Sequence, residues 1–402
     1  MKIEKISFRK VTGTIPTDGV FWEERLLRPV DIYPEFRRQG PFWLGYQNRG
    51  DQIDDRHFRH EAVFVRIDTD AGVHGIGGPM SPGIAAIIGR QLAPLLMGRD
   101  PVATEFLWDL MHRTLVHGRQ GEPMMAISAV DCALWDLKGR WLNQPVHRLI
   151  GGPTRTEIPA YASMLGYNVD DPGLVRERAQ AYREQGYRAQ KWFFRHGPMG
   201  GPEGLSKNVE LVRTLREALG EDDDIMLDCW QSMDFPYVLQ LAERIEAYRP
   251  RWLEECAMPD RIDTYRRIKA KIRIPLAGAE HEYTRWGFKR FIEQEALDVL
   301  QPDIYWCGGL SETLKIAAYA TVHDLITIPH GHSTPATIHF SATQSPIHTP
   351  LQEYLVKWND VHQHFLQHPL KPVNGVLQVP DAPGLDMELD EAKIEAEEEL
   401  VF

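Results

Sequence analysis

Three acidic residues, Asp228, Glu254 and Glu280, each follow a short apolar run typical of a buried strand. These runs span 225–227, 252–253 and 274–279. The acids recur at equal spacing, and each interval between them carries a helical pattern. Consecutive strands of a parallel barrel lie side by side and all end on one face, so we expect the three carboxylates to converge there.

Three converging carboxylates need a counter-charge, because carboxylates packed together repel one another and rise in pKa. A hard divalent cation with oxygen ligands supplies that charge, and Mg²⁺ suits such a set. A single acid at a strand end can equally cap the helix that follows. Three in register favour the metal, so the sequence predicts that Asp228, Glu254 and Glu280 hold one Mg²⁺.

A strand–loop–helix rhythm begins near Ile158 and continues to about residue 355. Predicted strands cover 159–163, 189–194, 225–228, 252–254, 274–280, 297–303, 325–330 and 351–355. Alternating units of this length predict a parallel α/β barrel of eight strands. We place a first domain at 1–152, the barrel at 153–355, and a tail at 356–402 that returns to the first domain.

The first domain has a different pattern. Residues 63–77 predict a hairpin, and residues 101–115 and 124–140 predict helices. Residues 16–59 form a long segment rich in Arg, aromatic residues, Pro and Gly. Loops of this length are usually functional or disordered, and the aromatic content argues against disorder. We interpret the segment as a lid over the site; a structural flap is the alternative.

The composition bounds the possible partners. The 402 residues include 45 basic and 57 acidic ones, and the net charge of −12 argues against binding to nucleic acid or to a membrane surface as the main role. A small anionic substrate is still possible, because a local site can be cationic. The four cysteines are far apart and suggest reduced thiols in the cytoplasm. No signal peptide and no stretch of the ~20 apolar residues that a membrane span needs is present.

Four more polar residues, Lys191, Asp303, His330 and Glu353, fall at the ends of predicted strands or within the last one. Asp303 and His330 belong to adjacent strands. A carboxylate beside an imidazole fixes its tautomer and raises its basicity, so His330 is predicted to be the general base. A histidine bonded only to backbone is the alternative. His281, directly after Glu280, is a weaker candidate for a catalytic or substrate contact.

The remaining expectations concern the substrate. Lys191 could donate to a substrate carboxylate or an enolate oxygen. Glu353 could stay protonated and donate to the same oxygen, or it could be an ordinary polar residue at the rim. A metal-held carboxylate facing an imidazole base suits proton abstraction from the carbon next to that carboxylate. The residues expected to contact substrate are Arg28, Arg37, Arg38, Trp230 and Arg195.

These residues and their surroundings resemble the enolase superfamily, in its mandelate racemase subgroup. The resemblance covers nearly the whole chain and rests on 129–136, 149–152, 227–228, 253–255, 279–281, 301–303, 308–309 and 329–331. It implies an α/β fold, a modified (β/α)7β TIM barrel with an α+β N-terminal capping domain. It also implies that the three acids bind Mg²⁺, that His330 paired with Asp303 is the acid/base residue, and that the chain forms a homo-oligomer.

Within the subgroup the chain looks most like acid-sugar dehydratases. Racemases of the subgroup carry Lys-x-Lys on the second strand, and here Phe193 replaces the second lysine. One base fits dehydration: His330 removes the proton alpha to the carboxylate and then protonates the departing 3-hydroxyl. The product is a 2-keto-3-deoxy acid, and the expected substrate is an aldonate of the L-rhamnonate type. A racemase or epimerase of a hydroxy acid and a non-catalytic sugar-acid sensor are the alternatives.

Overall fold

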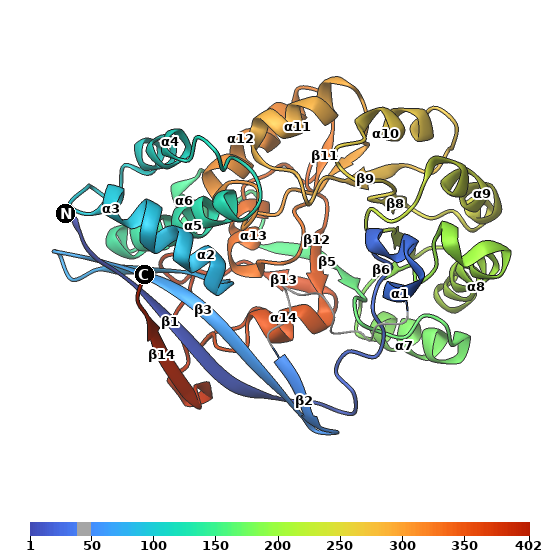
Figure 1. Ribbon diagram of the computed structural model, residues 1–402, viewed down its shortest axis with the longest axis horizontal. Coiled ribbons are helices and arrows are strands. Elements are labelled where there is room, and N and C mark those ends of the chain that lie inside the picture. Colours follow the sequence, from blue (N-terminus) through green and yellow to red (C-terminus); the bar gives the residue numbers. More distant parts are fainter. Residues whose placement is uncertain (38–49) are drawn as a thin grey trace.

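The computed structural model describes residues 1–37 and 50–402, in two parts that lie side by side in Figure 1. The first part is a capping domain built on an antiparallel sheet. Its strands are β1 (Ile3–Pro16), β2 (Gly50–Asp54), β3 (His57–Thr69), β4 (His74–Met80) and β14 (Ala396–Leu400). β4 pairs with β3 as the predicted hairpin, and β14 (dark red) pairs with β1 (blue). The sheet therefore combines strands from both terminal regions of the chain.

Helices pack against this sheet. They are α2 (Pro82–Ile87), α3 (Ala93–Leu96), α4 (Thr104–Thr114), α5 (Glu122–Leu142) and α6 (Val146–Leu149). α5 approaches β4 so closely that a Cβ added at Gly75 would lie 2.1 Å from the Ala133 carbonyl oxygen. The helix predicted from residue 101 begins later, because Asp100 accepts a hydrogen bond from the Val102 amide at 3.0 Å and closes a turn there.

The second part is a parallel barrel. Its strands are β5 (Glu157–Ser163), β6 (Ala189–Phe193), β7 (Asp224–Asp228), β8 (Trp252–Glu254), β9 (Leu276–Gly278), β10 (Val299–Leu300), β11 (Ile326–Thr327) and β12 (Gln352–Leu355). They pair in chain order from β5 to β11, and β12 pairs with β5. Among the described residues no ladder joins β11 to β12; between them the Thr327 amide donates to the His348 carbonyl at 2.7 Å and the Thr349 hydroxyl donates to the Thr327 carbonyl at 2.8 Å, in the segment just before β12. The predicted α/β fold class is confirmed.

Helices surround the barrel, as Figure 1 shows. They are α7 (Pro172–Glu184), α8 (Gly201–Leu219), α9 (Phe235–Ile245), α10 (Ile262–Lys269), α11 (Thr284–Glu293), α12 (Gly309–Thr321) and α13 (Thr334–Ser341). The last barrel strand is followed by the short helix α14 (Val356–His362). After it, β13 (Val376–Gln378) pairs antiparallel with β5. The exact domain boundaries at 152 and 355 stay predictions.

Four barrel strands end earlier than predicted: β6 ends one residue early at Phe193, and three others end at Gly278, Leu300 and Thr327. Glu280 and His330 therefore stand in loops just beyond the sheet. Ala279 has a φ of 74°, which takes the chain out of the strand direction immediately before Glu280. Side chains in these loops do not follow the two-residue alternation of a strand, so the register of the sheet alone does not decide where they point.

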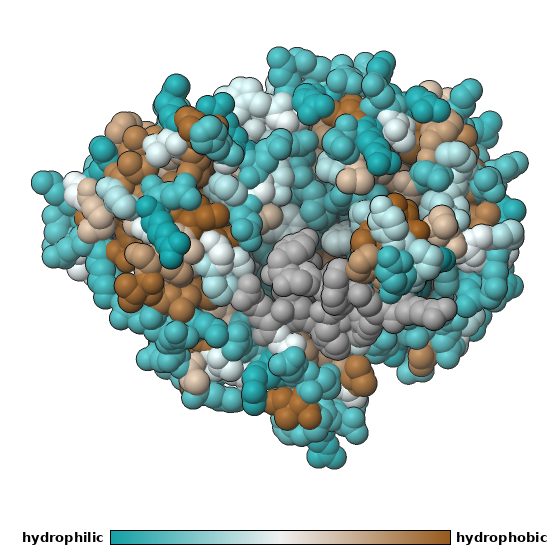
Figure 2. All heavy atoms as spheres, viewed as in Figure 1, coloured by the Kyte–Doolittle hydropathy of each residue, from teal (hydrophilic) through white to brown (hydrophobic). Residues whose placement is uncertain are grey.

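The surface is mostly polar on the face that Figure 2 shows, with apolar residues gathered over the helices of the capping domain. Within the described ranges, no helix is both long and apolar enough to cross a membrane. The four cysteines are buried as free thiols.

Candidate active site

Asp228, Glu254 and Glu280 converge as predicted at the end of the barrel where the strands finish. One oxygen of each carboxylate lies within 4.8 Å of an oxygen of the other two, and all three residues are buried. Asp228 ends β7 and Glu254 ends β8, whereas Glu280 follows β9 in its loop. Adjacent parallel strands place Asp228 directly beside Glu254 in the register of the sheet.

The three carboxylates already have several donors. The Lys191 ammonium lies 3.2 Å from Asp228 Oδ2 and also pairs with Glu254. The indole of Trp252 and the amide of Gln301 both donate to Glu254 Oε2, at 3.0 and 2.8 Å. Glu254 is thus held in one orientation, with Lys191 at Oε1 and with Trp252 and Gln301 at Oε2.

Burial shifts the protonation equilibria of these three acids toward their neutral forms, despite the positive charge of Lys191. Burial raises the pKa of Asp228 to about 6, with Glu280 adding to the effect and Lys191 opposing it. Burial likewise raises the pKa of Glu280 to about 7 and that of Glu254 well above its usual value. A divalent cation would reverse these shifts. Three buried carboxylates with hard oxygen donors therefore fit Mg²⁺.

His330 is positioned by Asp303. Its Nδ1 lies 2.7 Å from Asp303 Oδ2, and the other oxygen of Asp303 accepts the Tyr305 amide at 2.8 Å. His330 Nε2 consequently points toward the acids, 3.6 Å from Glu280 Oε2. Burial lowers the pKa of His330, but Glu280 and Asp303 outweigh it and raise the pKa to about 10. A cation bound at Glu280 would remove much of that effect and leave a neutral imidazole at lower pH.

A second imidazole–carboxylate pair lies on the other side of Glu280. His281 Nδ1 is 2.9 Å from Glu255 Oε2 and 3.4 Å from Glu280 Oε1. Burial opposes charge on His281, but Glu255 and Glu280 raise its pKa to about 9. Glu255, Glu280 and His281 also have ligand atoms within 4.8 Å of one another. A charged imidazole on Glu255 makes this group an ion pair rather than a second cation site.

Sequence reasoning missed Glu255. Alternation along the strand would turn it away from Glu254's side of the sheet, but its φ of 44° lies in the left-handed region and breaks the alternation. The signal available in the sequence was the Glu254-Glu255 doublet, followed after one strand–helix unit by Glu280-His281.

Glu353 and Lys191 form one buried pair. Lys191 Nζ lies 2.8 Å from Glu353 Oε1, and the other oxygen of Glu353 accepts the Gly331 amide at 2.9 Å. Burial favours the neutral acid, but Lys191 outweighs it and lowers the pKa of Glu353. The structure thus favours the ionised form over the protonated donor that we considered. Lys191 is fully buried among acids on this side.

A cavity of about 50 Å³ opens directly above the acids. Asp228, Glu280 and His330 form its floor, and Trp230, a predicted contact, is in its wall. The other lining residues are mostly aromatic or apolar: Trp22, Leu26, Leu165, Phe193, Trp306, Leu355 and Trp358, with Glu24, Arg25 and His332 as the charged or polar ones. Trp22, Glu24 and Arg25 belong to the predicted lid, and sequence reasoning did not single them out.

Two of the predicted lid arginines, Arg28 and Arg37, lie beside this cavity and not in its wall. Arg28, Arg37 and Arg195 line a neighbouring cavity of about 260 Å³. Arg28 lies 3.3 Å from Asp31, Arg37 donates to the Met199 carbonyl at 2.8 Å, and Arg195 donates to Glu24 at 3.0 Å. Arg38 lies outside the described residues. Arg195 therefore reaches the cavity above the acids through Glu24.

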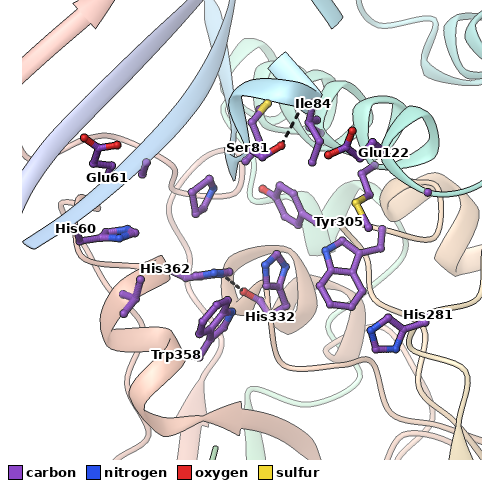
Figure 3. A pocket seen from close by; sticks show the side chains of 18 of the residues that line it. His60, Glu61, Ser81, Ile84, Glu122, His281, Tyr305, His332, Trp358 and His362 are labelled. Atoms are coloured by element: carbon purple, nitrogen blue, oxygen red, sulfur yellow. Dashed lines mark hydrogen bonds between the residues drawn. The ribbon is translucent and has the colours of Figure 1, made fainter. Parts of the chain in front are cut away.

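A larger cavity of about 420 Å³ lies between the capping sheet and the barrel (Figure 3). The capping side contributes His60, Glu61, Ser81 and Glu122, and the barrel side contributes His281, Tyr305 and His362 among others. Trp306, His332 and Trp358 line both this cavity and the one above the acids, so the two are adjacent.

A barrel with a carboxylate triad, a His–Asp pair at its mouth and a capping domain over it defines a class of protein. Residues 174–393 match the family described as Enolase C-terminal domain-like, and residues 56–151 match the family described as Mandelate racemase / muconate lactonizing enzyme, N-terminal domain. The chain belongs to the enolase superfamily.

Particular relatives are similar over almost their full length. L-rhamnonate dehydratase of Saccharopolyspora erythraea is 33% identical over 409 aligned residues, covering 97% of each chain. The structure of rhamnonate dehydratase from Gibberella zeae complexed with Mg is 30% identical, with a TM-score of 0.82 over 98% of this chain and 95% of that one. The 3,6-anhydro-D-galactonate cycloisomerase from Zobellia galactanivorans is 29% identical, with a TM-score of 0.76 over 98% and 100%.

Proposed function

We propose that the protein is a Mg²⁺-dependent dehydratase of a sugar acid, a hydro-lyase that acts on an aldonate of the L-rhamnonate type. The observation that carries the proposal is the placement of His330 Nε2 over the carboxylate triad, with Asp303 behind it. The similarity to L-rhamnonate dehydratase supports the substrate class.

Asp228, Glu254 and Glu280 would hold the cation. When bound there, Mg²⁺ supplies positive charge to the substrate carboxylate and to the enolate that forms from it. Two of these acids are already held in place, Asp228 by Lys191 and Glu254 by Trp252 and Gln301.

His330 performs the proton transfers. As a neutral imidazole it takes the proton from C2 through Nε2, and the C2–H electrons move to form an enolate. As imidazolium it then gives that proton to the 3-hydroxyl, the C3–O bond breaks, and water leaves. The resulting enol becomes the 2-keto-3-deoxy acid. Asp303 keeps the Nδ1 proton in place through both steps and stabilises the charged imidazole.

The single base also favours dehydration over racemisation. Racemisation through two faces needs a second proton-transferring group, and Phe193 stands where racemases of this subgroup have their second lysine. Lys191 itself is held among Asp228, Glu254 and Glu353.

The test is a screen of the purified protein with Mg²⁺ against aldonates and aldarates, detecting 2-keto-3-deoxy products. We expect turnover of L-rhamnonate or of the closely related L-mannonate or L-lyxonate. Exchange of the C2 proton in D₂O without loss of water would replace the proposal by a racemase or epimerase. A protein that binds aldonates but neither dehydrates nor exchanges them would be a sensor. A cytoplasmic location and a homo-oligomer remain predictions, to be checked by fractionation and by light scattering.

A further inference from the structure

His332 is a second imidazole on the carboxylate that positions the base. Its Nδ1 lies 3.6 Å from Asp303 Oδ2, the same oxygen that His330 Nδ1 contacts at 2.7 Å. The two rings are nearly parallel, at 10° with centroids 6.1 Å apart. His332 therefore stands one ring further along the cavity wall from the base.

The surroundings of His332 hold its ring in place. Figure 3 shows it beside His362 and Trp358 and below Tyr305. The His362 ring packs against it with centroids 4.0 Å apart, and His362 Nδ1 donates to the His332 carbonyl at 2.9 Å. Trp306 packs at 5.0 Å. A ring clamped in this way has one orientation to offer to a ligand.

That orientation leaves one nitrogen for the cavities. Nδ1 is buried, makes no hydrogen bond to any residue that the structure describes, and faces Asp303. With the ring held in this orientation, Nε2 is the nitrogen left to face the two cavities that His332 lines. Burial and the neighbouring His362 keep the pKa of His332 well below its usual value, so the ring is neutral. The negative oxygen of Asp303 favours the proton on Nδ1, which makes Nε2 a hydrogen-bond acceptor.

We propose that His332 Nε2 accepts a hydrogen bond from a hydroxyl on C4 or C5 of the sugar acid and thereby selects the substrate. This inference rests on the proposed function, which places the substrate carboxylate at the acids and C2 at His330. His332 follows His330 along the cavity wall and lines both cavities, so the substrate carbons beyond C3 would pass it on the way to the larger cavity. Most of the other residues lining the cavity above the acids are apolar and cannot accept that bond.

The experiment compares two variants at position 332. His332→Leu removes the acceptor, and His332→Gln keeps an amide oxygen near the position of Nε2. The same histidine-to-leucine change at the exposed His323, in the turn that follows α12, is the matched control. Each protein is assayed with Mg²⁺ on L-rhamnonate and on its 4-deoxy and 5-deoxy analogues, and the readout is the ratio of kcat/KM values within each protein.

We expect the wild type to discriminate against one deoxy analogue by ~10-fold or more, which is the loss when a buried acceptor is left unpaired. In His332→Leu this ratio should fall to about 1, in His332→Gln it should stay above 1, and in His323→Leu it should equal that of the wild type. A purely structural role would lower kcat/KM for all three compounds by the same factor and leave the ratio intact. That result would overturn the proposal while the dehydratase function stands.

Binding separates failure of this inference from failure of the proposed function. In the His330→Asn background, calorimetry with Mg²⁺ measures the dissociation constant of each compound without turnover. The ratio of these constants between L-rhamnonate and each deoxy analogue then replaces the ratio of kcat/KM values. If aldonates bind with a ratio that depends on His332 but the wild type never dehydrates them, the role of His332 is supported and the dehydratase proposal is refuted. Aldonates that do not bind at all would overturn both.

Discussion

Two imidazole–carboxylate pairs flank Glu280, and they differ in what they leave free. His330 bonds Asp303 through Nδ1 and turns Nε2 to the acids. His281 directs the same Nδ1 at both Glu255 and Glu280. His330 is in the floor of the cavity above the acids, whereas His281 lines only the larger cavity. A pair acts as a base only when its far nitrogen faces the reacting carbon, so this geometry supports His330 as the proposed base, and we expect His281 to orient Glu280.

The largest effect should come from His330→Asn. We expect kcat to fall by about 10²–10⁴-fold or more, because the variant lacks the general acid/base. Mg²⁺ binding, measured by calorimetry, should stay within a few fold, since Asn lies beyond the three ligands. Near-normal turnover in this variant would transfer the base role to the other pair.

Glu254→Gln should weaken Mg²⁺ binding by more than the ~10–100-fold that loss of an outer hydrogen-bond partner costs. The change removes one of three predicted ligand carboxylates. It also replaces one carboxylate oxygen with an NH₂ group, which cannot accept the hydrogen bonds that Trp252 and Gln301 donate to Oε2. Glu243→Gln on the outside of the barrel is the matched control. An unchanged Mg²⁺ titration would exclude Glu254 from the metal site.

The affinity for Mg²⁺ should rise with pH between about 5 and 8. In the metal-free protein the pKa of Asp228 is about 6 and that of Glu280 about 7, so protons compete with the cation below these values and are released when it binds. Calorimetry in buffers of different ionisation enthalpy measures that release. An affinity independent of pH would show that the acids are already ionised without the metal.

The same cation should distinguish the two histidines by NMR. Without Mg²⁺ we expect His330 to titrate near pH 10 and His281 near pH 9, because Glu280 stabilises both charged rings. Adding Mg²⁺ should lower both pKa values, and that of His281 less, because Glu255 contributes most to raising the pKa of His281 whereas Glu280 contributes most at His330. Equal shifts would remove the distinction between the pairs.

His281→Gln should lower kcat/KM by about 10-fold, well below the effect at His330, since it disturbs only the orientation of Glu255 and Glu280. Kinetics on the substrate found in the screen measure it. A loss as large as that of His330→Asn would make the two pairs equivalent.

The smallest effects should come from the lid arginines. Arg28→Ala and Arg37→Ala should change the relative kcat/KM among L-rhamnonate, L-mannonate and L-lyxonate by a few fold, because Arg28 pairs with Asp31 and Arg37 anchors the segment to Met199. Arg38→Ala belongs to the same comparison. An unchanged profile in all three would remove these arginines from the determination of specificity.

The chain made the barrel and its acids predictable, because apolar runs, helical intervals and strand ends are local patterns with a fixed period. Asp228 and Glu254 follow from them directly, whereas Lys191, predicted to end its strand, lies in the middle of β6. Glu255 did not, since one residue with positive φ redirects its side chain. Trp22 and Arg25 did not either, because a segment without periodicity was brought to the site by long-range contacts. The Glu23 amide donates to the Gly166 carbonyl at 2.9 Å, and Lys357 donates to the Phe21 carbonyl at 2.6 Å.

The pairing of β14 with β1 sets an order on biosynthesis. β1 leaves the ribosome before every other strand of its sheet, but the strand that covers its outer edge is made roughly 20–80 s later at ~5–20 residues per second. During that interval the nascent chain exposes an unpaired edge that other chains could join. The strand that finally covers it carries Glu397, Glu398 and Glu399, and such charges discourage further pairing at its own outer edge. Translation thus completes the capping sheet only after the barrel strands have been made, and it does so with a strand whose charges oppose aggregation.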